Sequence, residues 1–200
     1  MNLIRSTAAS ALVAGTLFFN VNAAADIEAP SGTYVVESTH AYITISYSHL
    51  GFSTPHVGFN DFDVTLEFDA AAPENSTLNV VVDATSVDSR VADFDDHLNG
   101  EDFFQTDMYP EITFASTKIE MTGPDTALIT GDLTIKDQTH PVTLEATLNK
   151  AGMHPMLKTT VMGFNASATL NRSQWGLGYA VPMVGDEVDL EITVEMMPKG

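Results

Sequence analysis

The stretch SVDSRVADFDDHLNGEDFFQTDMYPEITF, Ser86–Phe114, decides how the fold is interpreted, because elsewhere after the first 25 residues the pattern is that of strands. Side chains of this stretch recur at three- and four-residue steps, as on one face of a helix: Val91, Phe94, Asp95 and Leu98. Ser89 is suited to cap the first turn, and Gly100 is suited to end the helix. The pattern predicts a short helix over residues Arg90 to Asn99.

The residues that follow this helix predict how it is anchored. Phe103 and Phe104 are adjacent, so on an extended chain their rings point to opposite sides. The pair Tyr109–Pro110 interrupts the chain, and Ile112 and Phe114 then resume the two-residue alternation of a strand. We expect a single helix, anchored by two aromatic rings, to plug one end of a β-barrel.

Most of the remaining chain alternates apolar and polar side chains, as strands with one buried face do. The clearest apolar rows begin at Phe62, Leu78, Val142, Phe164 and Val188. About eight or more strands at roughly ten-residue spacing are typical of an antiparallel sandwich or barrel. The long last strand is expected to pair with the first strand, which opens at Gly32, and so to close a barrel. The segment Asn149–Pro155 is predicted to be a loop.

The first residues have the pattern of a secretory signal peptide. The apolar run Ala8–Phe19 has 12 residues, too few to span a bilayer as a helix. Small residues permit cleavage after Ala23 or Ala25, and a retained membrane anchor is the alternative. We therefore assign residues 1–25 to the signal peptide and residues 26–200 to one exported domain, which has no Cys and must be stable without disulfides.

The chain is strongly acidic, with 27 Asp and Glu against 8 Lys and Arg, and a formal net charge of −19. Arg5 is the one charged residue of the predicted signal peptide, so the exported domain carries 7 − 27 = −20. Such a surface repels nucleic-acid phosphates and anionic membrane surfaces, and nucleic-acid binding is excluded. Solubility accounts for the acidity, and an acidic recognition patch is the alternative.

Motifs for metal binding and catalysis are missing from the sequence. The six His have neither H-x-x-x-H spacing nor Cys partners, so no metal site is predicted. No G-x-S-x-G elbow occurs, and the neighbours Asp95 and Asp96 do not face each other on a helix. The chain is therefore not predicted to be an enzyme. His97, with apolar neighbours Phe94 and Phe103, is expected to be buried and bonded to backbone, with ligand contact as the alternative.

Several segments, in order along the chain, carry a resemblance to a known family. They are HAYITISYSHLGFSTPHVGFNDFDV (His40–Val64), DATSVDS (Asp83–Ser89), DDHLNGEDFF (Asp95–Phe104), YPEITFAST (Tyr109–Thr117), GDLTIKDQTHPVTLEA (Gly131–Ala146), NRSQWGLG (Asn171–Gly178) and VGDEVDLEITVE (Val184–Glu195). The chain resembles the YceI-like family, named for polyisoprenoid binding, over nearly all of Ala29–Met197. The resemblance implies an all-β, lipocalin-like antiparallel β-barrel of about eight strands with one short α-helix, located in the periplasm. Residues 26–200 would then be a YceI-like lipid-binding domain.

The resemblance also implies a ligand. Family members are associated with long isoprenoid chains, such as polyprenyl phosphates or quinones, held inside the barrel, and some are linked to stress responses. Where the family helix runs R-D-x-H-L-[KR]-S, this chain has Phe94 and Asn99 in place of the two basic residues, and His56–Gly58 lacks one before its Gly. Because basic groups are the natural partners of a phosphate, these departures favour a neutral isoprenoid such as a quinone.

The predicted ligand site is the inside of the barrel. An eight-stranded barrel can hold one ligand where its inward side chains are not all bulky, and a solid core is the alternative. The alternation fixes two faces of each strand without saying which is inward. The predicted lining residues are Phe62, Val64, Phe94, His97, Leu98, Phe103, Phe114, Leu144, Ala166, Trp175 and Ile192.

Two further residues are given roles. Arg172 is expected to bridge to the helix carboxylates Asp93, Asp95 or Asp96, with contact to a ligand head group as the alternative. Trp175 is expected to pack at a mouth of the barrel.

These expectations combine into a periplasmic protein that takes an isoprenoid tail from a membrane and shields it from water. Its partner would be an isoprenoid lipid, a quinone or a polyprenyl chain, with transient membrane contact, no other cofactor, and a monomeric or homodimeric state. One alternative is a stress-related interaction module with a packed core. The other is an enzyme acting on a small apolar substrate, with His97 as base.

Overall fold

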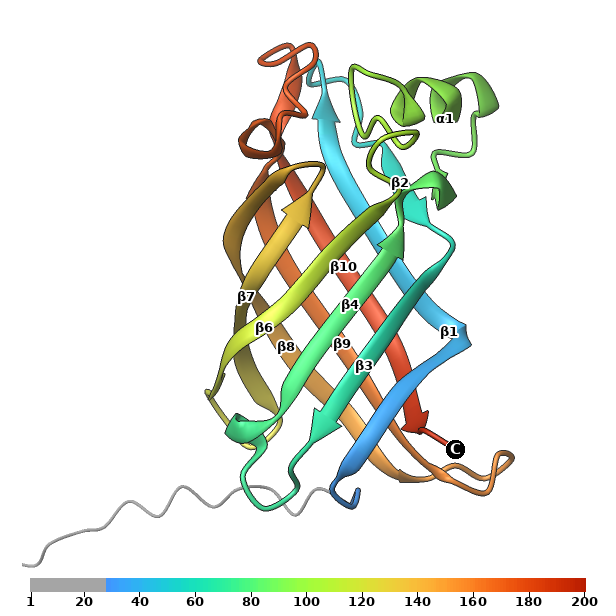
Figure 1. Cartoon of the computed structure of the whole chain (residues 1–200), viewed down its shortest axis with the longest axis vertical. Helices are drawn as coiled ribbons and strands as arrows, with labels where there is room; N and C mark the ends of the chain where they lie inside the picture. The colour runs from blue at the N-terminus through green and yellow to red at the C-terminus, as the bar shows by residue number, and fades with distance from the viewer. Residues whose placement is uncertain (1–27) are drawn as a thin grey trace, which may run out of the picture.

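A closed antiparallel barrel of eight strands forms the body of the molecule (Figure 1). The computed structural model describes residues 28–200, so the predicted signal peptide and its cleavage after Ala23 or Ala25 lie outside the described residues. Around the barrel the strands follow the order β1 (Gly32–His49), β3 (Phe62–Phe68), β4 (Thr77–Asp83), β6 (Glu111–Met121), β7 (Thr126–Ile135), β8 (Gln138–Met153), β9 (Thr160–Asn171) and β10 (Val184–Pro198). The pairing of β10 with β1 leaves no open edge between the first and last strands. The predicted all-β barrel is confirmed.

Strand β1 changes partner along its length. Its lower part, Gly32–Val35, pairs with β3, and its upper part, Ile43–Ser46, pairs with the short strand β2 (His56–Phe59). A register shift against β10 lies between Val36 and Ala41, where a bulge lets the strand bend. The two-residue strand β5 (Val87–Asp88) extends the sheet beyond β2.

The strands form where apolar side chains alternate with Thr, Asp and Glu, which places one face inside the barrel and one in water. The turn between β7 and β8 is the two-residue connection Lys136–Asp137, and Lys136 adopts a φ of 57°, as such hairpins require. The predicted loop Asn149–Pro155 is wrong, because β8 continues to Met153 and stays paired with β9. A register shift between Leu148 and Lys150 absorbs the irregular sequence there.

The one α-helix among residues 28–200, α1 (Ala92–Asn99), lies over the upper end of the barrel (Figure 1). Short 3₁₀ turns occur at Pro73–Asn75, Ala84–Ser86 and Arg172–Trp175. The helix starts later than predicted because Arg90 has a left-handed φ of 67°. Ser89 is not its cap: the Ser89 hydroxyl donates to Asp95 Oδ1 at 2.6 Å, so the helix carboxylate holds the preceding loop. Gly100 ends the helix as predicted, and its N–H donates to the His97 carbonyl at 3.0 Å.

The residues after the helix form turns rather than an extended chain. The Phe104 N–H donates to the Leu98 carbonyl at 3.0 Å, which folds the segment back under the helix. The expectation that Phe103 and Phe104 point to opposite sides is therefore wrong, and both rings line the space beneath the helix.

The lower half of the barrel is solid. Its buried side chains form one cluster: Ala29, Tyr34, Val64, Leu66, Phe68, Met162, Val194 and Met196. The rings of Tyr34 and Phe68 meet edge to face with centroids 6.1 Å apart, and the Tyr34 hydroxyl donates to the Pro30 carbonyl at 2.8 Å. This packing closes the lower end of the barrel.

Among the residues that the structure describes, no helix is both long enough and apolar enough to cross a membrane.

Candidate functional site

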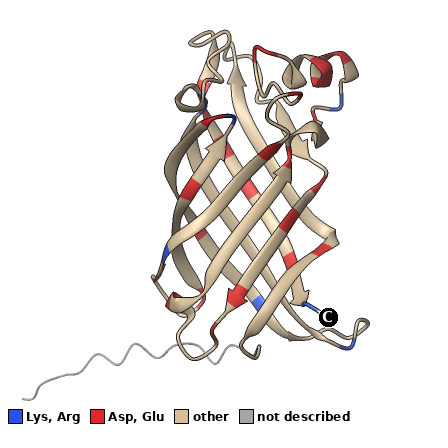
Figure 2. Cartoon of the chain, in the orientation of Figure 1, with Lys and Arg blue, Asp and Glu red and all other residues tan. Residues whose placement is uncertain are grey.

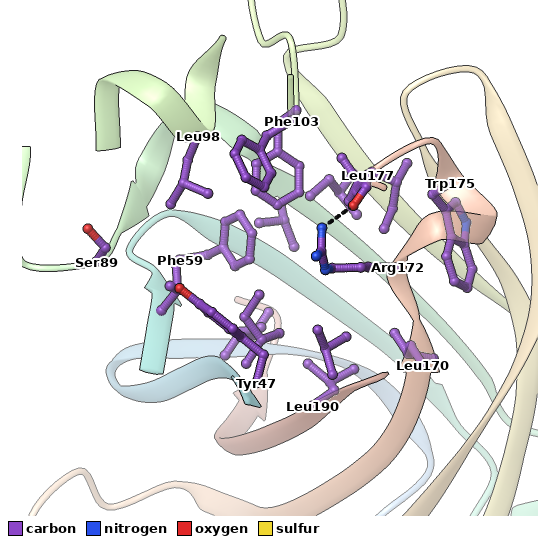
Figure 3. A pocket seen from close by; sticks show the side chains of 18 of the residues that line it. Tyr47, Phe59, Ser89, Leu98, Phe103, Leu170, Arg172, Trp175, Leu177 and Leu190 are labelled. Carbon is purple, nitrogen blue, oxygen red and sulfur yellow. Dashed lines mark hydrogen bonds between the residues drawn. The ribbon is translucent and has the colours of Figure 1, made fainter. Parts of the chain in front are cut away.

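A cavity of about 590 Å³ occupies the upper half of the barrel, within the size range of ligand pockets. Its walls come from inward side chains of the strands: Ile43, Ile45, Val80, Val82, Phe114, Leu133, Leu144, Leu190 and Ile192. Its upper side is formed by the helix and the segment after it: Val91, Phe94, His97, Leu98, Phe103 and Phe104. Figure 3 shows side chains from these elements converging on one space. The site is thus an apolar chamber under a helical cover.

Most of the predicted lining residues lie in the wall of this cavity: Phe94, His97, Leu98, Phe103, Phe114, Leu144, Trp175 and Ile192. Phe62, Val64 and Ala166 do not line it. Val64 belongs to the solid lower cluster, and Phe62 and Ala166 are partly buried against neighbouring core side chains. These three residues share the inward face with lining residues, since Phe62 lies opposite Val82 and Ala166 opposite Ile192. The sequence therefore predicted correctly that these side chains point into the barrel, but it did not predict how far along the barrel axis the cavity extends.

The sequence prediction missed several lining residues. Tyr47 continues the row of Ile43 and Ile45 along β1, so the alternation of that strand could have identified it. Leu177 and Tyr179 follow the 3₁₀ turn and have no periodic pattern, so only the folded structure brings them to the cavity.

Aromatic rings gather at the cover of the cavity. The His97 ring lies 5.0 Å from that of Phe103 and 5.2 Å from that of Tyr179, and Phe103 lies 6.4 Å from Phe94, all centroid to centroid. His97 is not buried against backbone as expected: its side chain is 39% exposed, and Nε2 lies 3.0 Å from Asp102 Oδ2. The reason is that the turn after the helix brings Asp102 beside the ring.

Trp175 lies at the upper end of the barrel, where it was predicted, and is 2% exposed. Its indole N–H donates to the Leu133 carbonyl at 3.1 Å, and its ring meets that of His140 edge to face at 5.2 Å. The one polar atom of the indole ring is therefore hydrogen-bonded, and the apolar surface of the ring faces the cavity.

Arg172 is a buried cation beside the cavity, only 8% exposed. Its guanidinium donates to the carbonyls of Leu177, Tyr179, Val184 and Gly185 (Figure 3 draws the bond to Leu177). The expected bridge to the helix carboxylates is wrong, because these four carbonyls take the donors and Asp95 is bonded to Ser89. Burial lowers the pKa of the Arg172 guanidinium, and the nearby Asp186 opposes this effect.

The loop held by Arg172 is also tied down by Asp186. The Ser173 N–H and hydroxyl donate to the Asp186 carboxylate at 2.8 and 2.7 Å, and these bonds lower the pKa of Asp186 from its ordinary 3.8. Because the pKa of Asp186 is lower in the folded state than in the unfolded state, its ionisation stabilises the fold at pH values above the unfolded-state pKa. This stabilisation is lost as the pH falls through the folded-state pKa.

We expect Asp186→Asn to lower the free energy of unfolding at neutral pH, with the difference from wild type shrinking in acid. Urea denaturation at about pH 7 and about pH 2.5 measures both differences. A difference that stays constant down to the lower pH would contradict the assignment of Asp186 as an ionised acceptor.

Tyr47 supplies a polar group inside the cavity. Burial raises the pKa of its hydroxyl above the ordinary 10.0, and the charge of Arg172 opposes this only in part. The hydroxyl is therefore protonated at neutral pH and able to donate. Among the described residues, no side chain or carbonyl accepts a hydrogen bond from it.

The cover of the cavity is acidic on its outer side. Asp93, Asp95 and Asp96 lie on the helix, and Glu101 and Asp102 follow it. Figure 2 shows acidic positions along the helix at this end of the barrel. Such a surface opposes an anionic group at the opening.

A second group of titratable side chains lies away from the cavity. Glu37, His40 and Glu195 each place one ligand atom within 4.8 Å of the others, which β1 and β10 bring together by pairing. His40 Nδ1 lies 2.8 Å from Glu37 Oε2, and this bond raises the pKa of His40 and lowers that of Glu37. His40 and Glu37 are thus already paired with each other.

Comparisons with known proteins agree with this architecture. A family model described as the YceI-like domain matches residues 34–196. A UPF0312 protein of Pseudomonas syringae pv. tomato is 38% identical over 192 residues, covering 95% of this chain and 96% of the relative. A UPF0312 protein of Pseudomonas putida is 40% identical over 159 residues, covering 80% and 82%.

Solved structures share the fold. A YceI protein of Campylobacter jejuni superposes with a TM-score of 0.70 at 27% identity, covering 76% of this chain and 90% of that one. BcnA of Burkholderia cenocepacia gives 0.73 at 23% identity, covering 80% and 98%. A polyisoprenoid binding domain of Saccharophagus degradans, implicated in plant cell wall breakdown, gives 0.66 at 10% identity, covering 83% and 98%.

Proposed function

The chain belongs to the YceI-like family, and from this premise we propose that it binds an isoprenoid lipid in the upper cavity and shields the tail from water in the periplasm. The observation that carries the proposal is an apolar cavity of about 590 Å³ that is closed below by packed side chains. A protein of the same fold described as a polyisoprenoid binding domain supports the choice of ligand. The apolar run at residues 8–19 supports export.

Burial of the tail supplies enough free energy. About ten buried chain carbons contribute roughly 8 kcal/mol at about 0.8 kcal/mol per CH₂. Before ordering costs, this corresponds to a dissociation constant of about 1 μM. A longer tail binds more tightly without further polar contacts, so the affinity follows the length of tail that fits inside.

The polar groups of the site favour an uncharged head group. The Tyr47 hydroxyl stays protonated at neutral pH and has a free donor for a carbonyl oxygen, while the outer carboxylates around the helix oppose a phosphate. We therefore propose an isoprenoid quinone in preference to a polyprenyl phosphate.

The two alternative functions fare differently. The hollow upper half argues against an interaction module with a uniformly packed core. The pair His97–Asp102 at the cavity wall has the arrangement of a histidine oriented by a carboxylate. The expectation that the chain is not an enzyme stays a prediction. If it is correct, His97→Ala should change the quinone affinity little. If the wild type instead converts a small apolar substrate and His97→Ala abolishes that reaction, catalysis is favoured.

We expect the purified protein to take up added quinone, and Tyr47→Phe to weaken quinone binding about fivefold to tenfold through loss of one hydrogen bond. The same variant should bind a polyprenyl hydrocarbon without a head group as the wild type does. Quenching of the Trp175 fluorescence by the quinone and native mass spectrometry measure the two affinities. Absence of any bound isoprenoid in either measurement would refute the proposal.

A further inference from the structure

Two loops at the upper end of the barrel expose large apolar side chains to solvent. The loop between β1 and β2 carries Leu50 and Phe52, and the segment leading into β10 carries Tyr179 and Met183. Phe52 is 90% exposed and Met183 is 67% exposed. We call these four side chains the apolar rim.

The two loops are neighbours and border the opening of the cavity. His49 lies opposite Val184 where β1 and β10 pair, and Gly185 packs closely on the Ser48 backbone. His49, Tyr179 and Val184 also line the cavity, so the rim continues its apolar lining outward. Figure 1 shows both loops at the same end of the barrel as α1.

The rim lies in the least charged part of a strongly acidic chain. Residues 38–60 and 173–185 contain no Asp, Glu, Lys or Arg, although the chain has 27 Asp and Glu. Many of the carboxylates at this end belong to the helix and the turn after it (Figure 2), and Asp186 directly follows the second uncharged segment. Exposed apolar surface that carries no charge and adjoins a ligand opening marks an interaction site.

We propose that the apolar rim inserts into the surface of a lipid bilayer with an uncharged or zwitterionic surface, so that the barrel opening faces the membrane. This rests on the proposed function, because an isoprenoid cargo is dissolved in a membrane and must cross the opening. Aromatic and Met side chains on short loops suit the boundary between head groups and acyl chains. The net charge of −19 opposes docking to anionic lipid, so the rim is expected to prefer zwitterionic lipid.

The test compares two double variants with matched changes. Phe52→Asp with Met183→Asp alters the rim, and Met156→Asp with Leu157→Asp alters exposed side chains of the β8–β9 loop at the opposite end (Figure 1). Lipid-free protein comprising residues 26–200, which include every element of the barrel, is floated with phosphatidylcholine vesicles. Wild type and the β8–β9 variant should float alike, and the rim variant should partition at least about tenfold less. Adding phosphatidylglycerol to the vesicles should weaken binding of the wild type.

Three results would overturn the docking proposal: a wild type that does not float, equal loss in both variants, or a rim that instead joins two copies. The last would appear as a doubled mass in vesicle-free solution that the rim variant abolishes. Circular dichroism verifies that each variant is folded. Quinone uptake from detergent micelles is measured separately, so a protein that floats without binding quinone refutes the proposed function alone, and one that binds quinone without floating refutes docking alone.

Discussion

Replacing Leu190 by Trp is expected to lower the affinity for quinone about a hundredfold or more, while the barrel stays folded. Leu190 lies in the cavity wall on β10, opposite Ile45 of β1 and Ala168 of β9. The indole would occupy space that the tail requires, and excluding only four or five tail carbons removes roughly 3 to 4 kcal/mol of apolar burial. The cavity accommodates the larger side chain, so the cost in stability is small compared with overpacking of a solid core.

The matched control for this variant is Glu191→Trp. Glu191 is the next residue of the same strand and is exposed on the outer face, so its replacement adds the same ring outside the cavity. We expect its affinity for quinone to equal that of the wild type. Isothermal titration calorimetry measures this affinity, and native mass spectrometry measures it for quinones of increasing tail length. If both variants bind quinone normally, the ligand does not occupy this cavity.

Gly131→Ala is expected to destabilise the barrel by about 3 kcal/mol, a large effect for one methyl group. A methyl built on Gly131 would lie 2.4 Å from Phe114 Cζ and 2.5 Å from the Ala115 carbonyl oxygen. The Phe114 ring would have to move, and the carbonyl belongs to the backbone of the neighbouring strand β6, which cannot move without loss of pairing. Thermal unfolding should fall by about 6 to 12 °C for a domain of this size.

Gly163→Ala is the matched control, because Gly163 is also a strand glycine but has no atom within 4 Å of the added methyl. We expect it to be neutral or slightly stabilising, since the new methyl restricts the unfolded chain. Equal thermal shifts in the two variants would show that strand propensity, and not the contact with Phe114, governs both positions.

The strands and their closure could be predicted from the sequence, because alternation along β10 and the length of that strand are local properties. The helix and its end at Gly100 were likewise predicted, but its start was not. The left-handed Arg90 and the bond from Ser89 to Asp95 depend on how the loop packs, which residue spacing does not express. The predicted role of Arg172 was wrong for the same reason, because its acceptors are backbone carbonyls, which any sequence would provide.

The position of the cavity along the barrel could not be predicted. Val64 and Phe114 are both inward apolar residues of strands, yet Val64 is packed in the lower cluster and Phe114 faces the cavity. Whether side chains meet across the barrel depends on residues from opposite walls, such as Tyr34 and Met162 below. The alternation of apolar and polar residues along one strand identifies the apolar face of that strand. Only the pairing of all the strands determines where the inward side chains leave a cavity.

Among residues 28–200, the packed cluster around Tyr34, Phe68 and Met162 closes the lower end of the barrel below the cavity. For the proposed isoprenoid ligand, this closed end means that the tail enters end first, and that the depth of the cavity limits how many isoprene units are buried. On this proposal the lipid would enter and leave by the upper end, and a second molecule could not displace it from below.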